Sequence, residues 1–357
     1  MTLGVALGFS GGVDSTLAAL KLKDLGYQVH AVHLNMWKWG AENTGEKEFQ
    51  QHSIELQQIS GVHLASIDAS EAMRRLVIED FNQQLSLGNT PSPCIRCNPL
   101  VKFKLLLDYA EANGLQYIAT GHYARVQRSE DGLYHLLRAA DLSKDQSYML
   151  CYLNQTILAR TLFPLGEFLK SEIKKDAREL GLSVSEEPES QDLCFLNQHS
   201  YQDFVKHFSP DILVPGNIVN RQGEVLGRHE GLALYTIGQR KGIRLAANEA
   251  YYVLEKDSVN NHLVVGFLNE LGNKEMRVKK TNWISGKIPN ECECDVKIRY
   301  RAKNVPARLE RIGESNDYDV HFQQALRDIT PGQFAVFYRD DQVLGGGMIS
   351  KVAGNNV

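Results

Sequence analysis

A glycine- and serine-rich segment near the start of the chain constrains its fold more than any other feature. The segment lies between an apolar run at residues 3–7 and a leucine-rich helical pattern that ends at Gly26, so it is predicted to join a buried strand to a helix. Glycines let the backbone approach an anion, and a helix N-terminus offers unpaired N–H groups. The segment therefore predicts a nucleotide phosphate site; the alternative is an ordinary turn capped by Asp14. Its residues are Gly8, Phe9, Ser10, Gly11, Gly12, Val13, Asp14 and Ser15.

The composition of this segment separates it from the two commoner phosphate loops. No Gly-Lys-Ser/Thr follows it, and the chain contains no Gly-x-Gly-x-x-Gly, which argues against a kinase-like P-loop and against a dinucleotide fold. The run from Ser10 to Ser15 resembles the PP-loop of the ATP pyrophosphatases. That resemblance implies a grip on the β and γ phosphates of ATP while a substrate oxygen attacks the α phosphate. Both serines would add hydroxyl donors, and Asp14 could hold Mg²⁺.

Two cysteines follow a proline-rich stretch within residues 90–98 and precede an amphipathic helical pattern. Cys94 and Cys97 are therefore predicted on a loop just ahead of a helix N-terminus. The helix dipole, together with Arg96 and Lys102, would favour thiolate over thiol at this place. Thiolates act as nucleophiles and as metal ligands, so the pair is a candidate for either chemistry.

A third cysteine and four further motifs extend the pattern along the chain. Cys194 falls on a predicted loop after Pro188, where alone it would indicate no more than a buried thiol. Together with the segments above, these motifs resemble the bacterial tRNA-specific 2-thiouridylases, in order, from about residue 3 to about residue 350. The further motifs lie at residues 120–125, 144–148, 235–242 and 344–347.

The resemblance implies a reaction. In this family, ATP drives replacement of the C2 oxygen by sulfur in the wobble uridine, position 34, of tRNAs for Glu, Gln and Lys. The C2 oxygen is a poor leaving group, and adenylation converts it into a good one before sulfur displaces AMP. By the same resemblance, Cys194 receives sulfur as a persulfide, and Cys97 forms a disulfide with it to release the product. A cysteine desulfurase or a sulfur carrier protein would supply this sulfur, and free sulfide would suffice if an iron–sulfur cluster took the place of the persulfide.

The remaining site residues are predicted as follows. Besides the phosphate loop, Leu34 and Gly121 are expected to contact ATP, although Leu34 also fits simple core burial. For Asp145 the alternative is a helix cap. The residues expected at the target base are Ser92, Pro93 and Cys94. Those expected to contact tRNA are His122, Lys144, Asp145, Gln146, Arg299, Tyr300 and Gln333.

Cys94 departs from the commonest family pattern, in which an aspartate with an acid/base role stands at this position. A thiol has an ordinary pKa of about 8.5 and an aspartate one of about 4, so the two are not equivalent. Cys94, Cys97 and Cys194 could instead hold a [4Fe-4S] cluster by three irons, because thiolates are the usual ligands of such clusters. The other interpretation makes Cys94 a spare thiol beside a persulfide chemistry. The sequence leaves both open.

Strand-like runs alternate with helical patterns in the first part of the chain, at residues 29–34, 62–67 and 117–120. This alternation predicts an α/β fold with a doubly wound parallel sheet. Later runs, including one at 296–300, are typical of a small β-rich central module followed by a compact β-barrel. The predicted domains are a catalytic PP-loop domain at 1–204, the central module at 210–276 and a tRNA-binding barrel at 277–352.

Composition bears on the cellular compartment of the protein and on its partners. No apolar run in the 357 residues approaches the length of a membrane span. Six cysteines without an N-terminal apolar signal segment predict a reducing cytoplasm, and a monomer is expected. The net charge of −4 is unusual for a tRNA enzyme, but residues 297–311 contain six Lys or Arg and one acid. Such a run favours phosphate contacts, the alternative being a solvated strand face.

Two other functions compete with tRNA thiolation. Another PP-loop enzyme, such as an amidotransferase-type ligase, would adenylate a carboxylate or a different base and would not need the cysteine pair. A non-catalytic ATP-binding RNA or iron–sulfur scaffold would not need Ser10, Asp14, Cys97 and Cys194 together. Formation of AMP and pyrophosphate that depends on tRNA would separate the three functions.

Overall fold

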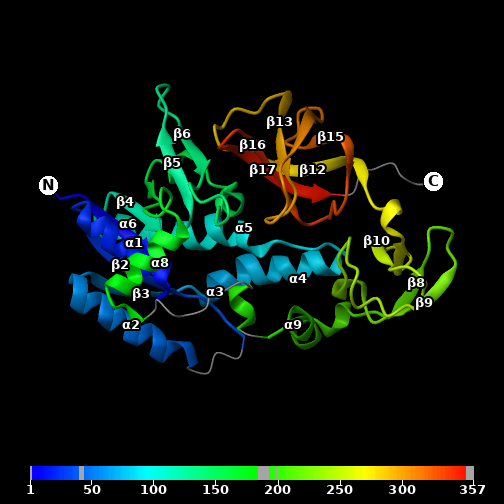
Figure 1. Ribbon diagram of the computed structural model, residues 1–357, viewed down its shortest axis with the longest axis horizontal. Coiled ribbons are helices and arrows are strands. Elements are labelled where there is room, and N and C mark those ends of the chain that lie inside the picture. Colours follow the sequence, from blue (N-terminus) through cyan, green and yellow to red (C-terminus); the bar gives the residue numbers. More distant parts are fainter. Residues whose placement is uncertain (1, 40–43, 184–192, 198, 351–357) are drawn as a thin grey trace.

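The computed structural model describes residues 2–39, 44–183, 193–197 and 199–350, which form three β-sheets with helices around the first (Figure 1). The first sheet is parallel, with strand order β3-β2-β1-β4-β7. Successive strands are added first on one side of β1 and then on the other, so the topology switches between β1 and β4, where ligands of doubly wound sheets bind. The strands are β1 (Gly4–Gly8), β2 (Gln28–Asn35), β3 (His63–Asp68), β4 (Tyr117–Thr120) and β7 (Thr161–Leu162).

Helices cover both faces of this sheet because its strands are apolar on both sides. Val5 and Leu7 of β1 pack in one hydrophobic cluster with α1, and Ala6 packs in another with α6. Two π-helical segments, η1 (Arg74–Ile78) and η2 (Asn98–Lys102), join α3 to α4 and α5 to α6. The α-helices are α1 (Val13–Asp24), α2 (Thr44–Ser60), α3 (Ser70–Met73), α4 (Glu79–Ser86), α5 (Pro93–Cys97), α6 (Phe103–Ala112), α7 (Gln155–Leu158), α8 (Lys170–Glu179) and α9 (Tyr201–Phe208).

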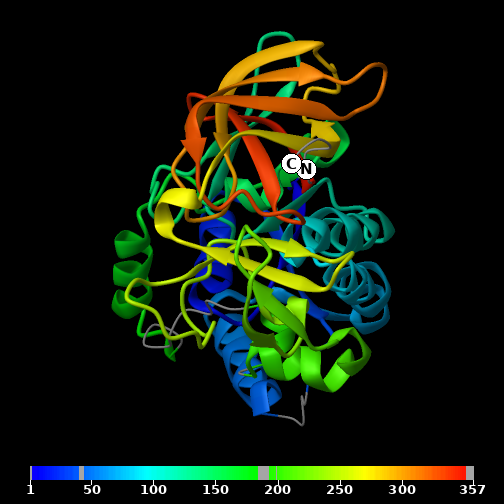
Figure 2. The same ribbon diagram turned by 90° about the vertical axis from the view of Figure 1, so that its right-hand side faces the viewer.

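The second sheet forms a small central module with strand order β10-β11-β8-β9. It has a core of its own, in which Val253 of β10 packs with Leu263 and Val265 of β11. Figure 2 shows this module (yellow-green) below the C-terminal sheet (orange and red). Its strands are β8 (Gly216–Val219), β9 (Val225–His229), β10 (Tyr252–Asp257) and β11 (His262–Gly266).

The third sheet closes into a six-stranded β-barrel, because β12 pairs with both β15 and β17. Two strands from the first part of the chain extend it: the hairpin of β5 (Ala124–Arg128) and β6 (Tyr134–Arg138) pairs with β17. The barrel strands are β12 (Asn273–Trp283), β13 (Glu291–Lys297), β14 (Val305–Arg311), β15 (Tyr318–Leu326), β16 (Phe334–Arg339) and β17 (Gln342–Ser350).

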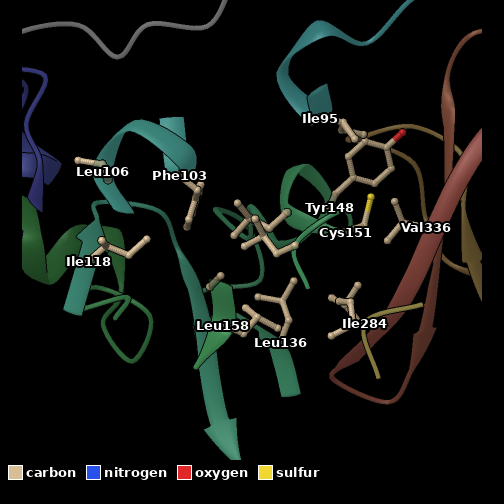
Figure 3. Close-up of a cluster of buried hydrophobic side chains, with 14 of the residues drawn as sticks. Ile95, Phe103, Leu106, Ile118, Leu136, Tyr148, Cys151, Leu158, Ile284 and Val336 are labelled. Atoms are coloured by element: carbon tan, nitrogen blue, oxygen red, sulfur yellow. The ribbon is translucent and has the colours of Figure 1, made fainter. Parts of the chain in front are cut away.

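A buried cluster joins the parallel sheet to the barrel (Figure 3). Phe103 of α6 and Ile118 of β4 belong to the same cluster as Leu136 of the hairpin and Val336 of β16. Because separation of the two sheets would expose this apolar surface to water, the cluster holds the barrel against the parallel sheet.

The predicted fold class is confirmed: a doubly wound parallel sheet, a small β-rich module and a C-terminal barrel. Two local predictions are wrong. The strand predicted at 296–300 ends at Lys297, and a turn follows. Cys94 and Cys97 lie within α5 rather than on a loop, because Pro93 occupies its first position and starts the helix ahead of them. Within the described ranges, no helix combines the length and apolar character needed to cross a membrane.

Candidate active site

The glycine- and serine-rich segment connects the carboxyl end of β1 to the N-terminus of α1. Gly11 has a φ of +84°, and a Cβ there would lie 3.2 Å from a ring carbon of Phe49, so the position requires glycine. Gly12 is the N-cap of α1 and supplies no side-chain cap. Ser15 Oγ accepts a hydrogen bond from Ser10 N at 3.2 Å and donates one to Gly12 O at 2.9 Å. The N–H groups of the first helical turn suit an anion.

The end of β4 packs against this loop. A Cβ at Gly121 would lie 3.2 Å from both the Asp14 carbonyl carbon and the Ser15 amide nitrogen, so the two backbones are in contact. Leu34, near the end of β2, is half-buried and packs against two hydrophobic clusters. The structure thus brings Gly121 to the phosphate loop, while the contacts it gives Leu34 are those of core packing.

A buried lysine that sequence reasoning missed reaches the phosphate loop. Lys170, the first residue of α8, is 5 % exposed, and its Nζ lies 2.6 Å from Asp14 Oδ1. The hydroxyl of Tyr123 donates to the same oxygen at 2.9 Å. These contacts fix the Asp14 carboxylate and place a positive charge beside a loop suited to phosphate. No motif signals this pair, because 156 positions separate its members.

The three candidate cysteines are brought into one neighbourhood. The Cys194 thiol acts electrostatically on the pKa of both Cys94 and Cys97. Cys97 is buried, with its Sγ 3.8 Å from Met73 Sδ, and Cys94 is half-buried. Cys194 is exposed and begins a short 3-10 turn at the edge of the described chain. Of the three thiols, Cys194 is therefore the one open to a large external partner.

The expectation that Cys94 and Cys97 favour thiolates is wrong. Burial raises the pKa of Cys94 to about 11 and that of Cys97 to about 12, and the opposing effect of Lys102 is smaller. Arg96 points elsewhere: its Nε lies 3.0 Å from Asp80 Oδ2. Both thiols are consequently protonated at neutral pH, and their ionisation requires a change in their surroundings, such as an arriving substrate or charge.

This difference in exposure predicts an order of chemical modification. Near neutral pH, iodoacetamide is expected to alkylate Cys194 at least about 100-fold faster than Cys97, because the thiolate is the reactive form and Cys97 is both buried and neutral. The Cys97 rate should still rise with pH beyond about 9, where an ordinary thiol levels off. Peptide mass mapping of timed samples measures both rates. A Cys97 rate that levels off at about pH 7 would contradict this burial.

The three thiols do not form a binding site for a single metal ion. Among the described residues, no three His, Cys, Asp or Glu side chains are grouped closely enough to hold a metal ion. A cluster held by Cys94, Cys97 and Cys194 stays a prediction.

His122 follows Gly121, two residues after the end of β4. Its Nδ1 lies 2.7 Å from Thr120 Oγ1, and its ring stacks at 6.2 Å from that of Phe103. Burial, with a smaller effect from Lys102, holds the pKa of His122 well below its ordinary value. His122 is therefore neutral at physiological pH, and it can donate or accept a hydrogen bond but adds no charge for a phosphate.

The segment Lys144-Asp145-Gln146 is tied to the protein's own backbone. Asp145 is buried, and its carboxylate accepts hydrogen bonds from Ala139 N and Ser147 N, both at 3.1 Å. Gln146 Oε1 accepts from Tyr123 N at 3.0 Å. Lys144 is half-buried. The short 3-10 helix that follows, Ser147–Leu150, has Gln146 as its N-cap and no side-chain cap, so Asp145 is not its cap. The Asp145 contacts orient the turn that carries Lys144.

The predicted barrel residues gather where the barrel meets the other two sheets. Arg299 Nη2 donates to Ile237 O of the central module at 2.9 Å. Gln333 Nε2 donates at 2.8 Å to Thr90 O, in the loop that leads to Ser92 and Pro93. Tyr300 packs against the parallel-sheet side through Tyr148, at a ring distance of 6.3 Å. The target-base residues and the barrel residues therefore share one junction.

The basic residues between 297 and 311 do not form a continuous free stripe. Arg308 pairs with Glu291 and Glu310, both at 3.1 Å. Arg311 donates to the carbonyls of Glu314 and Ser315 at 2.7 Å. The exposed basic residues of this run are Arg301, Lys303 and Arg308.

Comparison with known proteins covers nearly the whole chain. Family models match residues 3–198 (tRNA methyl transferase HUP domain), 202–267 (tRNA methyl transferase PRC-barrel domain) and 273–349 (Aminomethyltransferase beta-barrel domain). A tRNA-specific 2-thiouridylase MnmA of Chloroflexus aurantiacus is 39% identical over 353 residues, covering 97% of this chain and 98% of the relative. One of Carboxydothermus hydrogenoformans is 40% identical over 356 residues, with 97% of each chain covered.

Among solved structures, the chain is similar to the U34-tRNA thiolase NcsA from Methanococcus maripaludis with its [4Fe-4S] cluster. The TM-score is 0.36 at 17% identity, covering 58% of this chain and 67% of that one, a likeness too low to bear on the chemistry. The family models, and relatives that cover 97% of this chain, show the family of the protein. This chain belongs to the family of tRNA-specific 2-thiouridylases.

Proposed function

We propose that this protein is an ATP-dependent tRNA-uridine 2-sulfurtransferase that acts on the wobble uridine, position 34, of tRNAs for Glu, Gln and Lys. One observation carries the proposal: the phosphate loop and the cysteines meet at the same end of the parallel sheet. Gly121 contacts the loop, and the ring of the adjoining His122 stacks at 6.2 Å on that of Phe103. Phe103 begins α6, which follows the helix of Cys94 and Cys97 after a single π-helical segment. The relatives, named 2-thiouridylases, support the same reaction.

The first step activates the uracil C2 oxygen. That oxygen attacks the α phosphorus of ATP, a new P–O bond forms, and pyrophosphate leaves. The phosphate loop would hold the departing phosphates, with Ser10 and the N–H groups of the first turn of α1 as donors and Lys170 as the nearby positive charge. Asp14 has the oxygen ligands that Mg²⁺ prefers, and the ion, when bound there, would screen phosphate charge.

The second step transfers sulfur. A donor protein that carries a persulfide first transfers its terminal sulfur to the exposed Cys194 thiol; the donor's S–S bond breaks, and the donor is left as a thiol. The terminal sulfur of the Cys194 persulfide attacks C2, and AMP leaves with the former C2 oxygen. The Cys97 thiolate then attacks the Cys194 sulfur, which breaks the S–S bond, releases the 2-thiouridine sulfur and leaves a Cys97–Cys194 disulfide. An external dithiol reduces that disulfide before the next turnover. A reducing compartment that holds tRNA, the cytoplasm, suits this cycle.

In this route Cys94 forms no bond, which gives a specific prediction. Cys94→Asp restores the commoner residue of the family and removes one candidate iron ligand, so it is expected to retain activity within about threefold, because only two thiols exchange. Activity of anaerobically prepared protein and its iron content are measured together. Loss of activity in Cys94→Asp, accompanied by loss of about four irons per chain, would contradict the two-cysteine route and support a cluster.

The proposed function is tested by formation of AMP and pyrophosphate from ATP. Unmodified tRNA of the expected set should stimulate AMP formation, and a tRNA with cytidine at the wobble position should not. A ligase would respond instead to a small acceptor, and a scaffold would form no AMP. Stimulation by a small carboxylate with no response to tRNA would refute the proposal.

A further inference from the structure

A buried lysine of the central module contacts the loop that leads to the cysteine helix. Lys256, on β10, is only 4 % exposed. Its Nζ donates to Tyr235 O at 3.0 Å within the module, and to Asn89 O and Thr90 Oγ1, both at 3.3 Å, in the loop before α5. An ammonium group has three N–H donors, and these three oxygens lie within hydrogen-bond distance of it. A buried charge is tolerated only with such partners.

A β-bulge aims Lys256 at this loop. Between Val253 and Glu255 the register of β10 against β11 shifts by one residue, so Val253 pairs with Val265 and Lys256 with Leu263. Leu263 and Val265 face the same side of β11, into the core of the module. Without the bulge, strict alternation would put Lys256 on the opposite face from Val253. Bulges commonly re-aim a side chain beside a functional site.

The barrel contacts the same loop through residues 331–333. Thr90 N donates to Pro331 O at 2.8 Å, and Gln333 Nε2 donates to Thr90 O at 2.8 Å. Gly332 has no room for a side chain, since a Cβ there would lie 2.7 Å from Asn89 Cβ. Backbone and side chain of Thr90 are thus held by two modules that are distant in sequence.

The loop at residues 89–92 leads directly into α5, the helix that carries Cys94 and Cys97. Ser92 is the N-cap of α5, and Cys94 lies in its first turn. Ser92 contributes no side-chain cap, so the entry of this five-residue helix is held from outside rather than by its own capping group. A displacement of the loop would therefore be passed to Cys94 and Cys97.

We propose that Lys256 is a positioning residue that ties the central module to residues 89–90 and thereby sets the place of the Cys94–Cys97 helix against the barrel. The proposal rests on the proposed function for its catalytic consequence. It also gives the central module a role in the site, since the module holds one side of the cysteine loop while the barrel, through Gln333, holds the other.

The test uses the full chain with three substitutions. Lys256→Met removes the charge at similar length, Lys256→Arg retains it, and Lys206→Met is the control on an exposed lysine, 54 % accessible, of the neighbouring helix α9. Lys256→Met is expected to lower kcat for tRNA thiolation about 10- to 100-fold, the effect of misplacing reactive groups by about 1 Å, while KM for ATP stays within about twofold. Lys256→Arg should recover much of kcat, and Lys206→Met should match the wild type.

A second readout reports the loop without catalysis. In Lys256→Met, maleimide labelling of Cys94 and Cys97 should accelerate at least about fivefold, because the helix that carries them opens more often. The urea concentration at which the barrel unfolds should not change. Should Lys256→Met fail to fold, Thr90→Val, which removes one acceptor, is expected to change labelling in the same direction by a smaller factor. Unchanged labelling in a folded variant would overturn the proposal. Absence of tRNA thiolation by the wild type would overturn the proposed function but leave the labelling result valid.

Discussion

Cys97→Ala and Cys194→Ala are each expected to abolish tRNA thiolation while AMP still forms. The loss should reach at least about 1000-fold, because a covalent step has no substitute once its nucleophile is removed. Adenylation depends on the phosphate loop, whose hydrogen bonds involve neither thiol. The two half-reactions should therefore separate in these variants.

The matched control is Cys294→Ala, which removes a partly buried thiol of β13 in the barrel. It should thiolate tRNA at close to the wild-type rate. AMP is quantified by chromatography and thiolated tRNA by its retarded migration in a mercury-containing gel. A Cys97→Ala enzyme that still thiolates through many turnovers would contradict the assigned disulfide step.

Lys170→Met is expected to stop the first half-reaction instead. The variant loses the charge that lies 2.6 Å from Asp14 Oδ1 beside the phosphate loop. Removal of one group that stabilises developing charge costs about 10² to 10³ in kcat, so AMP formation should fall by that factor. Asp14→Ala should fall at least as far, and tRNA binding should change little in either variant, since the predicted tRNA contacts come from other residues.

The control for Lys170 separates electrostatics from helix packing. Lys21 of α1 pairs with Asp176 of α8 at 2.9 Å, so this pair joins the same two helices as Asp14 and Lys170 but lies away from the loop. Lys21→Met should keep AMP formation close to the wild type. Equal losses in Lys21→Met and Lys170→Met would mean that Lys170 acts only by holding the helices together.

The local parts of the fold can be predicted from the sequence. The strand, loop and helix at the phosphate site follow from contiguous residues, and the predicted bounds of β2, β3 and β4 agree with the observed ones to within a residue or so. The closure of the barrel by β12 and β17, and the addition of the β5–β6 hairpin to it, depend on pairing between distant segments. Such pairing leaves no local pattern.

In the candidate site too, residues in local motifs can be predicted from the sequence, and contacts between distant residues cannot. The resemblance to a family draws attention to Cys97, Cys194 and Gln333, but the sequence does not reveal Lys170 or Lys256, whose partners lie far along the chain. The sequence predicts a lowered pKa for the thiols of Cys94 and Cys97, whereas the structure raises it. A helix N-terminus and a nearby cation are visible in the sequence, whereas burial, the larger influence on Cys97, depends on tertiary packing.

The central claim is tested most directly by mass spectrometry of nucleosides from tRNA. Unmodified tRNA for Glu, Gln or Lys is incubated with the full chain, ATP with Mg²⁺ and a persulfide donor, then digested to nucleosides and fragmented. The account predicts one 2-thiouridine per tRNA, located at the wobble position and absent when ATP is omitted. It would be contradicted by tRNA that remains unthiolated while ATP is converted to AMP, or by sulfur found at any other nucleoside.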